Sequence, residues 1–164
     1  MAKKETKTRQ TLKFGFTQSE TKDLVKALNQ LLADYHVHYQ KLRNFHWNVT
    51  GGDFFDLHEQ FEQRYDKTKE EIDEVAERIR TFSHTPISTL KEYLGTSGIK
   101  EPKGIPSADK MVSEILDDYK IILKSQTEAA NIAHEMGDYG TLDMLNHYIF
   151  DMQKHSWMLE SFLK

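Results

Sequence analysis

The chain has 164 residues, of which 38% are hydrophobic and 29% are charged, and its formal net charge is −4. It contains no cysteine, which excludes disulfides and thiolate metal sites, so any bound metal must take nitrogen and oxygen ligands. No apolar run approaches the roughly 20 residues of a membrane span and no signal peptide is visible, so we expect a cytoplasmic protein without membrane segments.

The charge is distributed unevenly along the chain. Near its start, a cluster of basic side chains stands against the single acid Glu5; the cluster consists of Lys3, Lys4, Lys7 and Arg9. We expect residues 1–16 to form a flexible basic tail ahead of one folded domain over residues 17–164. This tail could bind DNA phosphates by displacing their counterions, or it could be a solvated terminus.

The first predicted helix follows a capping box, in which Thr17 is followed three positions later by Glu20. Apolar residues then recur at steps of three and four positions, as expected of one buried helix face. They are Leu24, Val25, Leu28, Leu31, Leu32, Tyr35, Tyr39 and Leu42. The pattern predicts a helix to about Trp47, ended by Gly51 and Gly52.

A second helix is predicted from about Asp53 to about Phe82, because apolar residues again recur at helical spacing. They are Phe54, Leu57, Phe61, Tyr65, Ile72, Val75 and Ile79. The connection that follows, residues 83–106, contains all three prolines of the chain. Its segment ISTLKEYLG nevertheless predicts one short helix.

A third helix is predicted from Ser107 to near Gly137, and a last one from about Thr141 to Leu163. Both show apolar residues on one face, and no stretch of the chain alternates apolar and polar residues as a half-buried strand would. The predicted fold class is therefore all-α, a four-helix bundle with a short helix in the connection between the second and third helices.

Candidate metal ligands share one narrow stripe on the second predicted helix: His58, Glu62, Asp73 and Glu77. At about 100° per residue they fall beside the apolar stripe, on the rim of the bundle. The rise from Glu62 to Asp73 is roughly 16 Å along the axis, whereas metal–ligand bonds are about 2 Å long. One ion therefore cannot join the two halves of this stripe within one chain.

A second copy of the helix, packed antiparallel about a two-fold axis, would bring each half opposite its complement. His46, at the end of the first helix, could reach over and join His58. The resulting inter-subunit site of two imidazoles and three carboxylates suits iron, manganese or zinc, and iron if redox chemistry is intended. The alternative is that the acids are solvated and the histidine is an ordinary polar residue on the rim.

The segments FHWNVTGGDFFDLHEQFEQRYD and IDEVAERI closely resemble the signature of the Dps proteins, the ferritin-like mini-ferritins of starved bacteria. The similarity continues through TPISTLKEYL and covers nearly everything after about residue 20. It implies a ferritin-like bundle and, by position, a set of ferroxidase ligands: His46, His58, Glu62, Asp73 and Glu77. The first three would come from one subunit and the last two from its two-fold mate. Position 62 is often Asp in the family, so Glu62 extends that ligand by one methylene.

The resemblance also implies an assembly and an activity. Family members form hollow dodecamers built from two-fold dimers, oxidise Fe(II) at a two-iron site, preferably with hydrogen peroxide, and store ferric mineral inside. Many bind DNA, and the family protects DNA from oxidative damage. We therefore expect a ferroxidase and iron-storage protein; the alternative is a DNA-compacting nucleoid protein in which iron oxidation is secondary. A di-iron site inside one bundle is disfavoured, because it needs Glu-x-x-His motifs that the sequence lacks.

Other residues have both a functional and a structural interpretation. Asp138 and Asp143 are candidates to line the threefold pore that admits iron in Dps-like shells; the alternative is helix capping near Gly137. Trp47 could pack at the metal site or intercept oxidising equivalents, and the alternative is an interface or core aromatic. Glu59 could help nucleate mineral or simply be solvated.

One further pattern lies on the last predicted helix. His147, Asp151 and His155 stand four positions apart, on one helix face, which makes a single-ion site conceivable. The family resemblance implies no metal role there, so rim or packing positions are the expected alternative.

Overall fold

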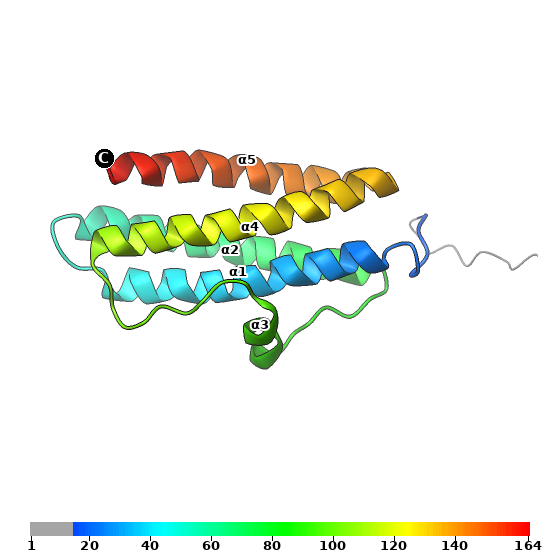
Figure 1. Ribbon diagram of the computed structural model, residues 1–164, viewed down its shortest axis with the longest axis horizontal. Coiled ribbons are helices and arrows are strands. Elements are labelled where there is room, and N and C mark those ends of the chain that lie inside the picture. Colours follow the sequence, from blue (N-terminus) through cyan, green and yellow to red (C-terminus); the bar gives the residue numbers. More distant parts are fainter. Residues whose placement is uncertain (1–14) are drawn as a thin grey trace, which may run out of the picture.

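The computed structural model describes residues 15–164, and the regular structure in this range is entirely helical. The elements are α1 (Lys22–Asn48), α2 (Phe54–Thr81), α3 (Leu90–Thr96), α4 (Ala108–Met136) and α5 (Tyr139–Phe162). Four long helices lie side by side, and the short α3 lies against α1 on one flank of the bundle (Figure 1). The predicted all-α four-helix bundle with a short helix in the long connection is confirmed.

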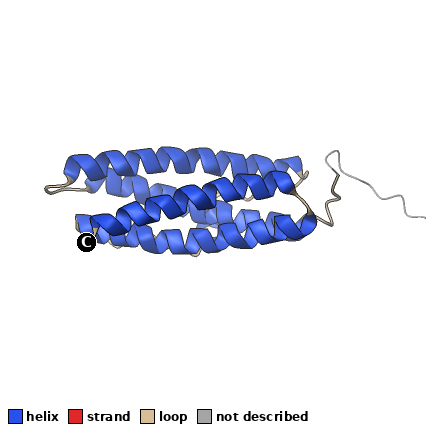
Figure 2. Ribbon diagram, turned by 90° about the horizontal axis from the view of Figure 1, so that it is seen from above, coloured by secondary structure: helices blue, strands red, loops and turns tan. Residues whose placement is uncertain are grey.

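The connection between α2 and α4 sets the topology. It runs back along the length of the bundle, so that α2 and α4 point in the same direction and α1 and α5 point the opposite way (Figure 1). The tight α1–α2 and α4–α5 turns instead join antiparallel neighbours. Seen from above, the long helices stay close to parallel (Figure 2). One long crossover of this kind is the arrangement of ferritin-like bundles.

The helix boundaries follow local chemistry, and two of them differ from the prediction. The capping box at Thr17 does form, because its main-chain N–H donates to Glu20 at 2.8 Å and the Glu20 N–H donates to the Thr17 hydroxyl at 3.3 Å. It closes a separate turn just ahead of α1, which begins only at Lys22. The last helix begins earlier than predicted, at Tyr139, because Asp138 caps it.

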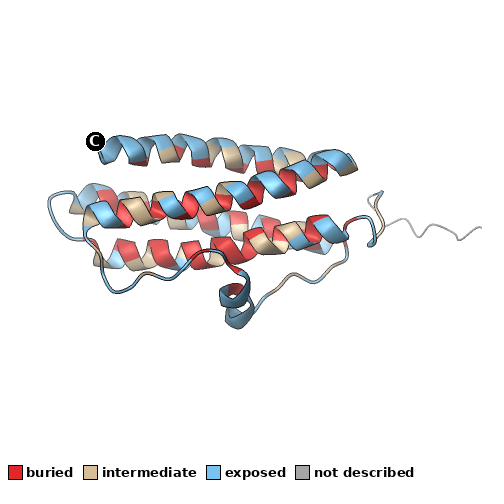
Figure 3. Cartoon of the chain, in the orientation of Figure 1, coloured by how far each residue is buried: buried red, intermediate tan, exposed pale blue. Residues whose placement is uncertain are grey.

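The apolar stripes of the long helices meet between them. Buried positions face inward along the bundle and the outer faces are exposed (Figure 3). The largest fully buried apolar side chains are Tyr35, Tyr119, Phe45, Phe61, Phe82, Leu24, Leu28, Leu31, Leu32, Leu42, Ile79 and Met111. Removing this apolar surface from water stabilises the bundle by about 25 cal/mol for each Å² buried.

The interior also contains ionisable groups contributed by different helices. Lys41 and His38 of α1 both bond to Asp118 of α4, at 2.6 and 2.9 Å. The Tyr119 hydroxyl lies 2.8 Å from His155 Nδ1 of α5. Burial lowers the pKa of His155 to about 3. Buried polar groups of this kind hold helices in one relative register, because each must keep its partner.

Glu71 of α2 is a carboxyl of the interior whose ionisation is opposed by its burial. It is 1% exposed, and one of its oxygens, Oε2, has no hydrogen-bond partner. Desolvation raises the pKa of Glu71 to about 7, although Tyr35 and Arg64 act in the opposite direction. Its protonation state therefore changes near neutral pH rather than in acid.

The start of the chain is only partly described. Phe16 packs edge-on against Phe82 with ring centroids 6.3 Å apart, so the last residue of the predicted tail contacts the bundle. Lys3, Lys4, Lys7 and Arg9 lie outside the described residues, and the DNA-binding tail stays a prediction. Within residues 15–164, the helices are too polar to supply a membrane-crossing segment.

Candidate metal centre

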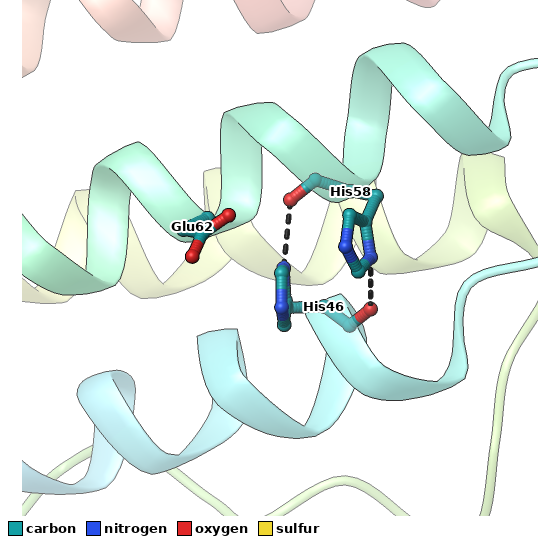
Figure 4. Close-up of side chains that lie close together, drawn as sticks. All are labelled: His46, His58 and Glu62. Atoms are coloured by element: carbon teal, nitrogen blue, oxygen red, sulfur yellow. Dashed lines mark hydrogen bonds between the residues drawn. The ribbon is translucent and has the colours of Figure 1, made fainter.

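The centre is built where α1 ends and α2 begins. His46 lies in the last turn of α1 and His58 near the start of α2, and the short turn between the helices brings them together (Figure 4). Gly51 makes this turn with a φ of 113°, a conformation that side-chain-bearing residues rarely adopt. Gly51, one of the two glycines predicted to end the first helix, therefore also helps to bring the two histidines together.

The two imidazoles are oriented by each other's main chain. His46 Nδ1 lies 2.8 Å from the carbonyl oxygen of His58, and His58 Nδ1 lies 2.9 Å from the carbonyl oxygen of His46. Because a carbonyl oxygen only accepts, each Nδ1 must carry the proton. In a neutral ring with its proton on Nδ1, the lone pair of Nε2 is free. Both histidines are therefore in a tautomer that can bind a metal through Nε2.

Packing fixes the planes of the same rings. The imidazoles of His46 and His58 stack with centroids 3.8 Å apart and planes at 22°. Phe54 also stacks with His58, at 5.0 Å and 28°. His46 is 8% exposed and His58 is half-buried, so both rings are held while the site stays open to solvent.

Glu62 supplies the carboxylate, one helical turn beyond His58 on α2 (Figure 4). One ligand atom from each of His46, His58 and Glu62 lies within 4.8 Å of the other two. Ligands of a single ion with bonds of about 2 Å lie no more than about 4 Å apart. The three side chains therefore lie within reach of one ion after small side-chain adjustments, and together they offer two nitrogens and one oxygen, a ligand set that fits Fe(II).

Asp73 and Glu77 do not join this cluster within one chain. Both are exposed on α2, further along the helix, and the cluster found among residues 15–164 contains only His46, His58 and Glu62. This separation agrees with the axial distance that the sequence predicts. Their place opposite the cluster of a second chain stays a prediction.

Tyr65 was assigned from sequence to the apolar stripe, and the structure gives it a polar contact at the site. Its hydroxyl donates to Glu62 Oε1 at 3.2 Å, and its ring lies edge-on to His46 with centroids 5.3 Å apart. The signal in the sequence was the three-residue spacing from Glu62, which places the two side chains on one helix face.

The two candidate pore acids have different surroundings. Asp138 is 4% exposed, accepts a hydrogen bond from the Thr141 N–H at 3.2 Å and pairs with Arg78 of α2 at 2.6 Å. The capping role that the sequence left open is therefore the one the structure supports for Asp138. Asp143 is exposed on α5, and a pore role for this residue stays a prediction.

The conceivable single-ion site on α5 does not assemble. His155 is buried against Tyr119, and Asp151 pairs with Arg64 at 2.8 Å. The exposed His147 bonds through Nδ1 to the main chain of Asp143. The three side chains are thus used by separate contacts, in agreement with the packing alternative.

Trp47 and Glu59 border the centre without entering the ligand set. Trp47 is 57% exposed, and the Arg43 guanidinium lies over its ring, 4.8 Å from the centroid. Glu59 is exposed and accepts a hydrogen bond from Gln63 at 3.0 Å. Trp47 is thus not a core aromatic of this chain, and roles for either residue in oxidation or mineral growth stay predictions.

Known proteins match nearly the whole chain. Residues 25–164 match the family model described as a ferritin-like domain. "General stress protein 20U" of Bacillus subtilis is 41% identical, over 87% of this chain and 99% of that protein. "DNA protection during starvation protein 2" of Bacillus anthracis is also 41% identical, over 87% of this chain and 97% of that protein.

Solved structures agree with the sequence matches. The crystal structure of the Dps protein from Vibrio cholerae O1 superposes with a TM-score of 0.91 at 36% identity, covering 96% of this chain and 99% of that chain. That protein is described as a member of a broad superfamily of ferritin-like diiron-carboxylate proteins. Family model, relatives and fold agree with the histidine and carboxylate pattern, and the chain belongs to the Dps proteins of the ferritin-like family.

Proposed function

We propose that this chain is a ferroxidase and iron-storage protein whose two-iron site is shared between two subunits. The observation that carries the proposal is the cluster of His46, His58 and Glu62, which offers two free imidazole nitrogens and a carboxylate but gains no fourth ligand from residues 15–164 of its own chain. Asp73 and Glu77 of a two-fold mate would complete it. The Vibrio cholerae relative, described as a ferritin-like diiron-carboxylate protein, supports this assignment.

The ligand chemistry suits iron that must enter, be oxidised and leave. Imidazole and carboxylate ligands bind Fe(II) and, unlike thiolates, do not commit it to a closed cluster. Two Fe(II) ions held together give two electrons to one hydrogen peroxide, which takes up two protons and leaves as two water molecules. The paired donation avoids the hydroxyl radical that a single electron would release. We therefore propose hydrogen peroxide as the preferred oxidant.

Shell formation and DNA protection complete the proposal. A dodecamer built from two-fold dimers would place the shared sites in its wall and enclose the ferric mineral. The Bacillus anthracis relative is named for DNA protection during starvation, which supports protection of DNA from oxidative damage. The second candidate function is DNA compaction through the basic residues ahead of the bundle, with iron oxidation secondary.

An anaerobic Fe(II) titration followed by a pulse of hydrogen peroxide tests the activity. Rapid growth of ferric absorbance is expected, with about one peroxide consumed for every two Fe(II) ions. The matched control is Glu59→Gln, which removes an exposed carboxylate next to His58 and should leave the initial rate unchanged. Oxidation no faster than that of Fe(II) in buffer, or one peroxide consumed per Fe(II), would contradict the proposal.

A further inference from the structure

Tyr65 contacts two of the three clustered ligands. Its hydroxyl donates to Glu62 Oε1 at 3.2 Å, and the edge of its ring meets His46 with centroids 5.3 Å apart and planes at 85°. Both contacts come from one side chain of α2, placed one helical turn beyond Glu62. No other side chain described in residues 15–164 has a recorded hydrogen bond to the Glu62 carboxylate.

We propose that Tyr65 is a positioning residue, whose hydroxyl holds one oxygen of Glu62 so that the other is presented to the metal. The inference rests on the proposed function, because it assigns a role at the same metal site. It concerns the orientation of a ligand and not the oxidation of the tyrosine.

The need for such a residue follows from the length and exposure of Glu62. A glutamate has one more rotatable bond than an aspartate and loses more conformational freedom when it is ordered. Glu62 is exposed, whereas His46 and His58 are held by stacking and by main-chain carbonyls. Without a partner, Glu62 would be the one ligand of the cluster that has to be ordered by the metal itself.

Ring contacts restrict where the Tyr65 hydroxyl can lie. The ring is half-buried and makes edge-on contacts with two others, His46 at 5.3 Å and 85° and Tyr39 at 6.0 Å and 88°. The Arg43 guanidinium in turn lies over the Tyr39 ring, 5.4 Å from its centroid. A ring with two such contacts has fewer positions open to its hydroxyl, as is the case for outer residues that orient metal ligands.

The test uses Co(II), whose binding is followed by its visible absorption and requires no oxidation. Tyr65→Phe keeps the ring and removes only the hydroxyl, and we expect it to weaken Co(II) binding by roughly tenfold, the lower end of losses for residues that orient metal ligands. In a Glu62→Asp background, where the shorter side chain does not reach the hydroxyl, the same substitution should change binding by less than about twofold. Tyr39→Phe is the matched control and should bind as the unsubstituted protein does.

The outcomes separate the two proposals. If the unsubstituted protein binds Co(II) and Glu62→Ala does not, while Tyr65→Phe binds normally, the positioning role is wrong and the metal site stands. An equal loss for Tyr65→Phe in the Glu62 and Glu62→Asp backgrounds would also overturn it, because the effect would then act through packing against His46. If the unsubstituted protein binds no Co(II), the proposed metal site fails and the role of Tyr65 fails with it.

Discussion

His46 and His58 each donate a ring N–H to the main-chain carbonyl of the other, at 2.8 and 2.9 Å, so the end of α1 and the start of α2 are joined by a reciprocal pair of hydrogen bonds. The two ligands thus have a structural function that does not depend on metal. The same bonds that select the metal-binding tautomer also close the turn between the helices.

This pair predicts a stability cost for His46→Ala in the metal-free protein. The substitution removes the donor to the His58 carbonyl and the stacked ring, and it should lower the free energy of unfolding by about 1–2 kcal/mol. Asp73→Ala, at an exposed position on α2, should change it by less than about 0.5 kcal/mol. Denaturant unfolding in the presence of a chelator measures both, and equal stabilities would show that the reciprocal bonds contribute nothing.

Assembly is checked by light scattering in neutral buffer. A dodecamer should give a particle of about twelve times the 19.2 kDa of one chain. The expectation follows from a ligand set that residues 15–164 of one chain leave incomplete and from membership of the Dps proteins. A stable monomer at micromolar concentration would contradict both the shell and the shared site.

DNA binding, if present, should depend on the first residues of the chain. Deleting residues 1–10 removes Lys3, Lys4, Lys7 and Arg9 from a chain whose formal net charge is already −4. The deletion should abolish a gel shift, and the shift of the full chain should weaken steeply as salt is raised. A variant with these four residues changed to Ala is the matched control for length and should behave as the deletion does. Binding that survives both changes would place the DNA contact elsewhere.

Glu71 predicts an unusual pH dependence of stability. Desolvation raises its pKa in the folded protein to about 7, above its ordinary value of 4.5. The folded state therefore holds this proton more tightly than the unfolded state, so the stabilising contribution is full below about pH 4.5 and is lost as pH rises through about 7. The loss amounts to ~3 kcal/mol at alkaline pH.

The measurement is the difference between Glu71→Gln and the unsubstituted protein. Glu71→Gln cannot ionise, so its unfolding free energy relative to the unsubstituted protein should rise by ~2.5 kcal/mol between pH 5 and pH 8. His38 and His155, whose pKa values are lowered by burial, act in the opposite direction but are present in both proteins. Glu70→Gln, at an exposed neighbouring position, should show no such rise. A pH-independent difference for Glu71→Gln would contradict the prediction.

The contrast between these residues shows what the sequence could predict. The long helices could be predicted closely because apolar periodicity records which face is buried. Helical spacing likewise predicted that Glu62 and Asp73 lie apart within one chain, whereas the role of Asp73 and Glu77 as ligands stays a prediction. The capping box at Thr17 was recognised correctly, yet it closes a single turn that does not continue into α1. A local hydrogen-bond pattern does not determine where tertiary burial begins to support a helix.

What the sequence could not predict depends on contacts between distant residues. Asp138 was a candidate for both a pore and a cap, and Arg78 from another helix makes the cap the supported role. Tyr65 counts as apolar in the sequence because its position continues the apolar stripe of α2, whereas its function in our proposal lies in the hydroxyl. The raised pKa of Glu71 arises from its desolvation inside the bundle, which depends on tertiary packing that no spacing within α2 records.

The last prediction tests whether the iron site is shared between chains. His58→Ala removes an imidazole from one half of the site, and Asp73→Ala removes a carboxylate from the other, so each variant alone should lose most rapid peroxide-driven oxidation of Fe(II).

When the two variants are unfolded, mixed and reassembled, half of the dimers should contain one chain of each kind. In such a dimer one site takes His58 from the Asp73→Ala chain and Asp73 from the His58→Ala chain, and is intact, while the other carries both lesions. Two-fold symmetry therefore predicts recovery of about one quarter of the unsubstituted activity. Co-purification through a tag on one variant shows that mixed assemblies form, and mixed assemblies as inactive as the separate variants would mean that His58 and Asp73 do not meet across the interface.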